Sequence, residues 1–175
     1  KDEEYRNEGI PVREDLSDCD VLMGVKEINT NELIPGKTYL FFSHTIKKQE
    51  YNKQLLKEIL KKNIKLIDYE VLTDINGLRV VGFGRFAGLV GAYNGLRAYA
   101  FRIGKTAPKP AYLCTDLDEM ENEIRDFKVP DIKIAASAWG RVTQGAMELL
   151  NLAGIKKISV EDYLNNPGYT TPVYV

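Results

Sequence analysis

The fold class is decided by residues 38–69, which read TYLFFSHTIKKQEYNKQLLKEILKKNIKLIDY. The first five residues are β-branched or aromatic apart from one leucine, which is typical of a strand. Between residues 47 and 62, apolar residues recur at helical spacing while Lys and Glu occupy the other face, which predicts an amphipathic helix. A short apolar run at 66–69 then predicts a second strand. A strand, a helix and a strand in this order indicate an α/β fold with parallel pairing.

The same alternation continues on both sides of this stretch. An apolar run at 20–25 predicts a strand before it, and Asn76-Gly77 marks a turn after it. Further strands are expected at 79–83, 132–136 and 157–160, and further helices at 86–103, 116–127 and 142–153. The sequence therefore predicts mainly parallel sheets with helices between the strands.

A polar stretch with Pro108 and Pro110 resembles a linker and divides the pattern into units of 1–104 and 105–175. Each unit contains fewer strands than a complete dinucleotide-binding domain uses. We therefore expect parts of two Rossmann-like domains, joined by a long glycine-containing helix and a proline-rich linker. The chain is expected to be a fragment of a longer enzyme and to be inactive alone.

Three glycines in the long predicted helix, Gly88, Gly91 and Gly95, have the spacing i, i+3 and i+7 and so share one face. Each costs roughly 1 kcal/mol relative to alanine in an exposed helix. The stripe predicts close approach by another backbone at this face. The alternative is that this segment is an irregular loop.

Composition excludes several classes of function. The 175 residues carry a formal net charge of −1, so bulk electrostatics gives no reason to expect nucleic-acid binding. Apolar stretches are interrupted well before the ~20 residues that a membrane span needs, and the chain opens on charged residues rather than a secretory signal. Cys19 and Cys114 have no metal-type spacing and are expected to be buried thiols. We expect a cytoplasmic protein with no metal site.

Candidate catalytic residues follow the predicted strands. Lys26 comes directly after the first apolar run, and His44 comes two residues after the strand at 38–42. Ligands of open parallel sheets bind beyond the carboxyl ends of the strands, so both side chains are placed where substrate should lie. Histidine exchanges protons near neutral pH, and a partly desolvated lysine can be tuned to do so. The alternative is a solvated surface lysine and a loop histidine.

Glu70, a third catalytic candidate, also follows a strand, and its carboxylate could pair with Lys26 and adjust its basicity. Arg79 could bind a substrate carboxylate with both prongs of its guanidinium, and Arg85 near the long helix is a second such arginine. An ordinary surface salt bridge is the alternative for each of these residues.

A candidate cofactor loop, SAWGRVTQGA, lies at 137–146 between a predicted strand and a predicted helix. Only part of the dinucleotide pattern G-x-G-x-x-G is present, because Ala138 and Thr143 hold its first and third positions around Gly140. Glu161 and Asp162 lie near the distance expected for a ribose-binding acid, which would favour NAD over NADP. The alternative is that both residues simply start the following helix.

Four segments together resemble lysine-forming saccharopine dehydrogenases, including the reductase half of bifunctional aminoadipic semialdehyde synthases. They are VLMGVKEIN at 21–29, FFSHTIKKQEYN at 41–52, LIDYEVLTDINGLRVVGFGRFAGLVGAYNGLR at 66–97 and WGRVTQGA at 139–146. The resemblance implies two Rossmann-like domains similar in plan to alanine dehydrogenase and to a subunit of proton-translocating transhydrogenases. Residues 1–104 would be part of the N-terminal catalytic domain and 105–175 part of the nicotinamide-dinucleotide-binding domain.

The resemblance also implies an activity, the interconversion of saccharopine with lysine plus 2-oxoglutarate, using NAD or NADP. Lys26 and His44 would be the acid–base pair, with Glu27 and Glu70 tuning the lysine. In the substrate site we expect Glu27 and Arg79. The cofactor-binding residues would be Ala138, Gly140, Arg141, Val142, Gly145 and Glu161. Self-association into a homo-oligomer is left open.

Two departures from the family pattern keep other interpretations open. The chain starts after the strand and arginine pair with which such enzymes begin, and Ser137 and Ala138 stand where they place at least one glycine. The alternatives are an alanine-dehydrogenase-like enzyme acting on a smaller amino acid, and a truncated ligand-binding remnant without catalysis.

Overall fold

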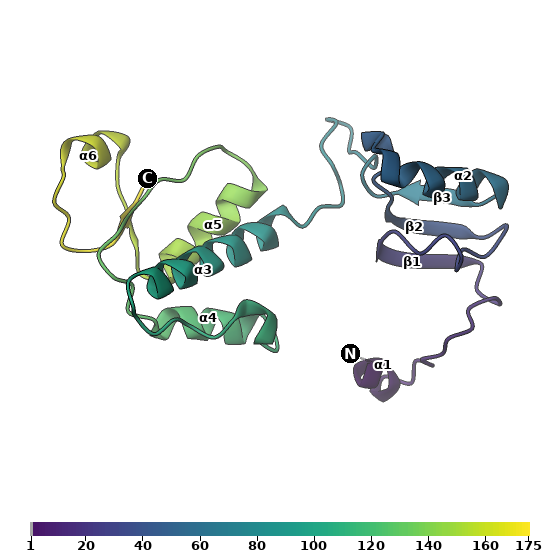
Figure 1. Ribbon diagram of the computed structural model, residues 1–175, viewed down its shortest axis with the longest axis horizontal. Coiled ribbons are helices and arrows are strands. Elements are labelled where there is room, and N and C mark those ends of the chain that lie inside the picture. Colours follow the sequence, from purple (N-terminus) through teal and green to yellow (C-terminus); the bar gives the residue numbers. More distant parts are fainter. Residues whose placement is uncertain (1) are drawn as a thin grey trace. The chain divides into compact units, whose positions relative to one another are not determined.

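The computed structural model describes residues 2–175, and the chain divides between Gly82 and Phe83 into two compact units (Figure 1). The first contains α1 (Asp2–Asn7), β1 (Val21–Lys26), β2 (Thr38–Phe42), two 3-10 turns (Thr45–Lys47 and Glu50–Asn52), α2 (Lys53–Lys61) and β3 (Lys65–Asp68). The second contains α3 (Gly84–Arg102), a 3-10 turn (Ala111–Leu113), α4 (Leu117–Asp126), β4 (Lys133–Ile134), α5 (Arg141–Leu152), β5 (Lys156–Lys157), α6 (Val160–Asn165) and β6 (Val173–Tyr174).

The first unit is built on a parallel sheet in the order β1-β2-β3, which can be followed in Figure 1. One face of this sheet packs against α2. Tyr39 and Phe41 from β2 are buried there with Leu55 and Ile59 from α2, and Leu33 completes the cluster. The predicted α/β fold with parallel sheets is confirmed.

Two local predictions for this unit were inaccurate. The α-helix expected from residue 47 begins only at Lys53, because Lys48 adopts a left-handed conformation with φ of 53° and two 3-10 turns take up the preceding residues. The strand expected at 79–83 is wrong. Arg79 forms an isolated bridge with Thr73, and no strand within residues 2–175 pairs with this segment to form a sheet. The segment is exposed apart from one half-buried residue.

The second unit has a small parallel sheet in the order β4-β6-β5. Its core is formed by buried side chains from α3, α4 and α5 with one strand residue of β6. They are Leu89, Tyr93, Leu96, Met120, Ile124, Leu149, Leu150, Ile155 and Tyr174. The helices predicted over 86–103, 116–127 and 142–153 are confirmed to within two residues at each end.

Helices α3 and α5 cross with their backbones in contact, as the glycine stripe predicted. A Cβ atom built on Gly88 would lie 1.9 Å from the carbonyl oxygen of Val142, and one built on Gly145 would lie 2.0 Å from the carbonyl oxygen of Arg85. Gly91 and Gly95 have open space instead. The close approach is therefore made by one glycine from each helix.

The division at Gly82 differs from the sequence-based boundary after residue 104. Helix α3 shares one hydrophobic core with α4 and α5, so it is part of the second unit rather than the first. Both cysteines are free, but they are half-buried rather than buried. Within residues 2–175, no helix is long and apolar enough to span a membrane.

Candidate functional site

The carboxyl ends of the three parallel strands in the first unit carry the candidate catalytic residues. Lys26 ends β1 and Glu27 follows it, His44 lies two residues beyond β2, and Glu70 lies two residues beyond β3. Because parallel strands end at the same edge of a sheet, residues distant in sequence lie in one region of this unit.

His44 and Glu70 are in direct contact. Nδ1 of His44 lies 3.0 Å from Oε2 of Glu70. The Glu70 side chain is only 3% exposed and the His44 side chain 17%. A carboxylate this deeply buried needs partners for its charge, and the imidazole supplies one of them.

Lys47 supplies the second partner, and sequence analysis missed it. Its Nζ lies 3.2 Å from Oε1 of Glu70 and 3.1 Å from Nδ1 of His44. Burial alone would raise the pKa of Glu70, but hydrogen bonds from Lys47 and His44 outweigh it and hold the pKa below its ordinary value. Glu70 is therefore an anion that can only accept hydrogen bonds.

This charge state favours one tautomer of His44. An ionised Glu70 favours the proton on Nδ1, where it is donated to Oε2, whereas the Lys47 ammonium 3.1 Å from Nδ1 can only donate and would need Nδ1 as an acceptor. Because the ammonium already has Oε1 of Glu70 as its acceptor at 3.2 Å, we infer that the proton is on Nδ1. The opposite tautomer would direct the Nδ1 lone pair at a carboxylate oxygen. With the proton on Nδ1, the Nε2 atom keeps its lone pair and is free to accept a proton. Nε2 lies 3.9 Å from Oε2 of Glu27, which is beyond hydrogen-bonding distance.

Lys26 is positioned by an irregularity in β1. Met23 pairs with Leu40, but Lys26 pairs with Phe42, so β1 uses three residues where β2 uses two. Paired residues of neighbouring strands project to the same face, which places Lys26 beside Phe42. The Phe42 ring in turn stacks on the His44 ring, with the centroids 6.5 Å apart.

His44 adopts a left-handed backbone conformation, with φ of 56° and ψ of 6°. A residue with a Cβ atom adopts this conformation at a cost of about 1–2 kcal/mol. Such a conformation persists only where surrounding contacts hold it, and it often marks a functional position. It turns the imidazole of His44 from the strand direction toward Glu70.

Arg79 lies on an exposed hairpin after β3, at its bridge with Thr73. Asp74 organises this hairpin by accepting hydrogen bonds from the amides of Asn76 and Leu78 at 2.9 and 2.8 Å. Gly77 takes the left-handed conformation that the Asn76-Gly77 turn predicted. The role of Arg79 as a substrate ligand stays a prediction.

A hollow of about 390 Å³ lies at the carboxyl edge of the sheet in the second unit. Its walls come from the residues after β4, β5 and β6, including Ala138, Trp139, Ser159 and Val175. We call it the carboxyl-edge hollow. It occupies the place at which open parallel sheets bind nucleotides.

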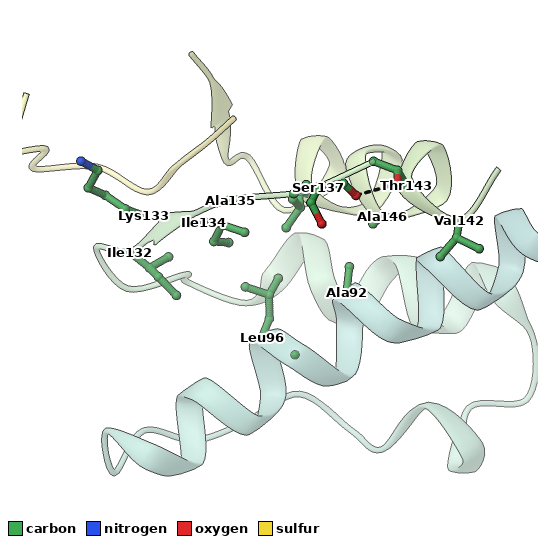
Figure 2. A pocket seen from close by; sticks show the side chains of 13 residues that line it. Ala92, Leu96, Ile132, Lys133, Ile134, Ala135, Ser137, Val142, Thr143 and Ala146 are labelled. Carbon is green, nitrogen blue, oxygen red and sulfur yellow. Dashed lines mark hydrogen bonds between the residues drawn. The ribbon is translucent and has the colours of Figure 1, made fainter. Parts of the chain in front are cut away.

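The N-terminus of α5 adjoins this hollow. Gly140 is the N-cap residue and gives the helix no side-chain cap, and a Cβ atom built on it would meet nothing within 4 Å. The hydroxyl of Thr143 donates to the carbonyl of Ser137 at 3.3 Å, a bond drawn in Figure 2, which ties the loop to the first turn of α5. Uncapped amides at a helix N-terminus fit the pyrophosphate of a dinucleotide.

Ala138 adopts a φ of 78°, a conformation suited to glycine. The loop backbone at residue 138 therefore has the left-handed conformation that glycine adopts most easily, although the residue is alanine and carries a methyl group. Arg141 and Val142 begin α5 and lie against Gly84 of α3, whose added Cβ would meet the Cβ of Arg141 at 3.0 Å.

Two predicted cofactor residues have other positions. Gly145 faces the carbonyl of Arg85, so helix packing explains this glycine. Glu161 is exposed on α6 and does not line the carboxyl-edge hollow, whereas Lys157 and Ser159 do. The role of Glu161 as a ribose-binding acid stays a prediction.

A second, apolar hollow of about 580 Å³ lies between α3, β4 and α5. Figure 2 shows Ala92 and Leu96 on α3 facing Ile132 and Ile134 across it, with Ala146 and Val142 from α5 at one side. Among the described residues, no group of three or more His, Cys, Asp or Glu side chains is gathered that could hold a metal ion.

Comparison with known proteins gives one family match. The family described as alanine dehydrogenase/PNT, N-terminal domain, matches residues 1–90. A solved structure of an L-alanine dehydrogenase has a similar fold, with a TM-score of 0.51 and 14% sequence identity, over 99% of this chain and 47% of that one.

Curated relatives fall into two groups. The chain is 49% identical to the mitochondrial alpha-aminoadipic semialdehyde synthase of Bos taurus over 58% of this chain and 11% of that protein. It is 36% identical to alpha-aminoadipic semialdehyde synthase of Arabidopsis thaliana over 85% of this chain and 16% of that protein. It is 29% identical to the NAD(+), L-lysine-forming saccharopine dehydrogenase of Candida glabrata over 80% of this chain and 41% of that protein. The chain thus spans less than half the length of each.

Proposed function

The chain belongs to the alanine dehydrogenase/PNT N-terminal domain family, and from that premise we propose that it forms part of a lysine-forming saccharopine dehydrogenase. Its relatives are dehydrogenases of amino acids, which supports an oxidoreductase of this type. The proposed reaction interconverts saccharopine with lysine plus 2-oxoglutarate and uses a nicotinamide cofactor.

The observation that carries this proposal is the contact between His44 and Glu70 at the strand ends. The buried carboxylate 3.0 Å from Nδ1 favours a proton on that nitrogen, which would leave Nε2 as a base. Saccharopine chemistry needs a base of this kind, because protons must leave and return to an amine during imine formation and breakdown.

In the condensing direction, the amine of lysine attacks the keto carbon of 2-oxoglutarate and a carbinolamine forms. Loss of water then gives an imine. Lys26 exchanges protons with the oxygen that leaves, and His44 exchanges a proton with the secondary amine through Nε2. Glu70 stabilises the imidazolium that forms when Nε2 is protonated, because its carboxylate lies against Nδ1.

A bound nicotinamide would supply or accept the hydride at the imine carbon. Gly140, with the first-turn residues of α5, would hold the pyrophosphate at the helix N-terminus. Ser159 and Lys157 would lie beside the rest of the dinucleotide at the carboxyl-edge hollow. Arg79 would bind a substrate carboxylate.

The test is a spectrophotometric assay of the protein that contains this chain, with lysine, 2-oxoglutarate and each reduced nicotinamide in turn. Oxidation of the nicotinamide that requires both lysine and 2-oxoglutarate supports the proposal. Activity with pyruvate and ammonia instead would establish an alanine-dehydrogenase-like enzyme. Binding of neither nicotinamide in calorimetry would leave a non-catalytic remnant and overturn the proposal.

A further inference from the structure

Asp68, the last residue of β3, is a buried carboxylate to which the proposed reaction gives no task. It is 8% exposed, although the strand around it presents half-buried and exposed residues. Oδ2 accepts a hydrogen bond from the hydroxyl of Ser43 at 2.5 Å, and Oδ1 accepts from the amides of Glu70 and Ser43 at 2.9 and 3.3 Å. A single side chain thus joins the segment after β2 to the segment after β3.

Both segments carry the proposed acid–base groups. The amide of Ser43, the residue immediately before His44, donates a hydrogen bond to Asp68. The second amide that donates to Asp68 is that of Glu70 itself. We propose that Asp68 is a positioning residue, which holds His44 and Glu70 in register so that the imidazole keeps its proton on Nδ1. This inference rests on the proposed function, because it assigns Asp68 to the site of that reaction.

Ser43 transmits this constraint to the histidine. It is fully buried, and besides donating to Asp68 its hydroxyl accepts a hydrogen bond from the amide of Thr45 at 3.1 Å. The hydroxyls of Ser43 and Thr45 also lie 2.8 Å apart. The residues on both sides of His44 are therefore hydrogen-bonded to each other, and Asp68 links them to the end of β3.

This anchor explains how His44 can keep a left-handed conformation outside a helix or a strand. With φ of 56°, its backbone would relax to a more common conformation if the neighbouring residues were released. Relaxation would carry the ring away from Glu70. The 3.0 Å contact that fixes the tautomer would then be lost.

The prediction is tested by ¹⁵N NMR of the imidazole in the untagged 175-residue chain, in which His44 is the only histidine. The chemical shifts of the two ring nitrogens report which one carries the proton. Wild type should show the form with the proton on Nδ1. Asp68→Ala should shift the population toward the form with the proton on Nε2.

Asp74→Ala is the matched control. Asp74 accepts two backbone hydrogen bonds in the same unit, but from amides of its own hairpin rather than from residues next to the histidine. Its removal should leave the imidazole spectrum as in wild type. Asp68→Asn should restore the wild-type spectrum in large part, because its amide oxygen can still accept from the amides of Ser43 and Glu70.

If Asp68→Ala does not fold, Ser43→Ala decides the question, since it removes the hydroxyl contacts and leaves the carboxylate in place. It should shift the tautomer in the same direction by a smaller amount. A wild-type imidazole spectrum in folded Asp68→Ala, or in folded Ser43→Ala where Asp68→Ala fails, would overturn the assignment of Asp68 as a positioning residue.

Activity gives the second readout in the complete enzyme. Asp68→Ala should lower kcat about 10²-fold with little change in KM, the size of effect expected when a reacting group is misplaced by about 1 Å. Asp15→Ala, which removes an exposed carboxylate that accepts from the amide of Ser17, should keep wild-type kcat. The imidazole spectrum does not depend on turnover. If Asp68→Ala shifts the tautomer but the wild-type enzyme has no dehydrogenase activity, the proposed function is wrong and the positioning role of Asp68 is still supported.

Discussion

Gly88 of α3 lies directly against the main-chain carbonyl of Val142 in α5, at a separation that leaves no room for a Cβ atom. The same helix carries Gly91 three residues later with open space around it. Helix propensity is equal at the two positions, so packing alone distinguishes them.

Gly88→Ala should therefore destabilise the protein, because the helices must separate to admit the methyl group. The expected loss is about 1–3 kcal/mol of unfolding free energy, as for overpacked cores. Gly91→Ala should instead be neutral or stabilising by up to about 1 kcal/mol, from helix propensity. Denaturant unfolding of the two variants measures both values. Equal stabilities would show that α3 and α5 do not cross at Gly88.

Replacing Lys26 with methionine removes the ammonium but keeps an unbranched side chain that is only one atom shorter. If Lys26 handles protons during carbinolamine formation, turnover of the complete enzyme should fall by roughly 10²–10⁴-fold. Steady-state kinetics with lysine and 2-oxoglutarate measures this. The control is Lys37→Met, because Lys37 pairs with Asp20 at the opposite end of β2. Wild-type turnover in Lys26→Met would remove the lysine from the mechanism.

Glu119 in the first turn of α4 should make the stability of the chain depend on acid pH. Its side chain pairs with Lys109 and accepts from the amide of Thr115 at 2.6 Å, and these contacts lower its pKa from 4.5 to about 2. A lowered pKa means that its contribution is complete above about pH 4.5 and is lost as pH falls toward 2.

Thermal unfolding followed across that pH range tests this contribution. Glu119→Gln should unfold at a lower temperature than wild type at neutral pH, and the difference between them should shrink as pH falls. Glu121→Gln on the same helix is the control, since the contact of Glu121 with Arg125 at 3.4 Å is exposed to solvent. A constant difference between Glu119→Gln and wild type would contradict the role of the Lys109 pair.

Ala138 holds a φ of 78° in the cofactor loop, so glycine should suit this position better. Ala138→Gly relieves about 1–2 kcal/mol of left-handed strain, against about 0.5–1 kcal/mol of extra chain entropy in the unfolded state. Ala136→Gly, two residues earlier, should lose stability, because φ at Ala136 is not positive. Unfolding free energies that fall equally in the two variants would contradict the strained loop.

The sequence predicted helices and strands well where the spacing of apolar residues reflects which side chains are buried. The alternation of apolar runs located β1, β2, β3 and the three long helices, and the strand ends located His44 and Glu70. Sequence analysis failed at 79–83, where the structure pairs no strand with the apolar run. Hydrophobic periodicity predicts a strand but does not show whether a second strand lies beside it.

Within the site, sequence analysis missed Lys47, Ser43 and Asp68. Lys47 lies in a lysine-rich segment with helical spacing, so it looked like one more lysine on the solvent-exposed face of that helix. Ser43 and Asp68 are small polar residues at the ends of apolar strands, and only coordinates show that they are buried and bonded to each other. A carboxylate near the end of a predicted strand, two residues before the candidate residue Glu70, is the signal that could have identified Asp68.

The extra residue of β1 between Met23 and Lys26 has a chemical consequence. With strict one-to-one pairing, Val25 would be opposite Phe42 and the ammonium group would be directed to the other side of the sheet. Deleting Val25 would remove the irregularity and still leave the lysine opposite Phe42, whereas adding a residue at this place would turn the ammonium group to the other side under regular pairing. The side on which this charge lies is therefore set by the register between β1 and β2, and not by the identity of residue 26 alone.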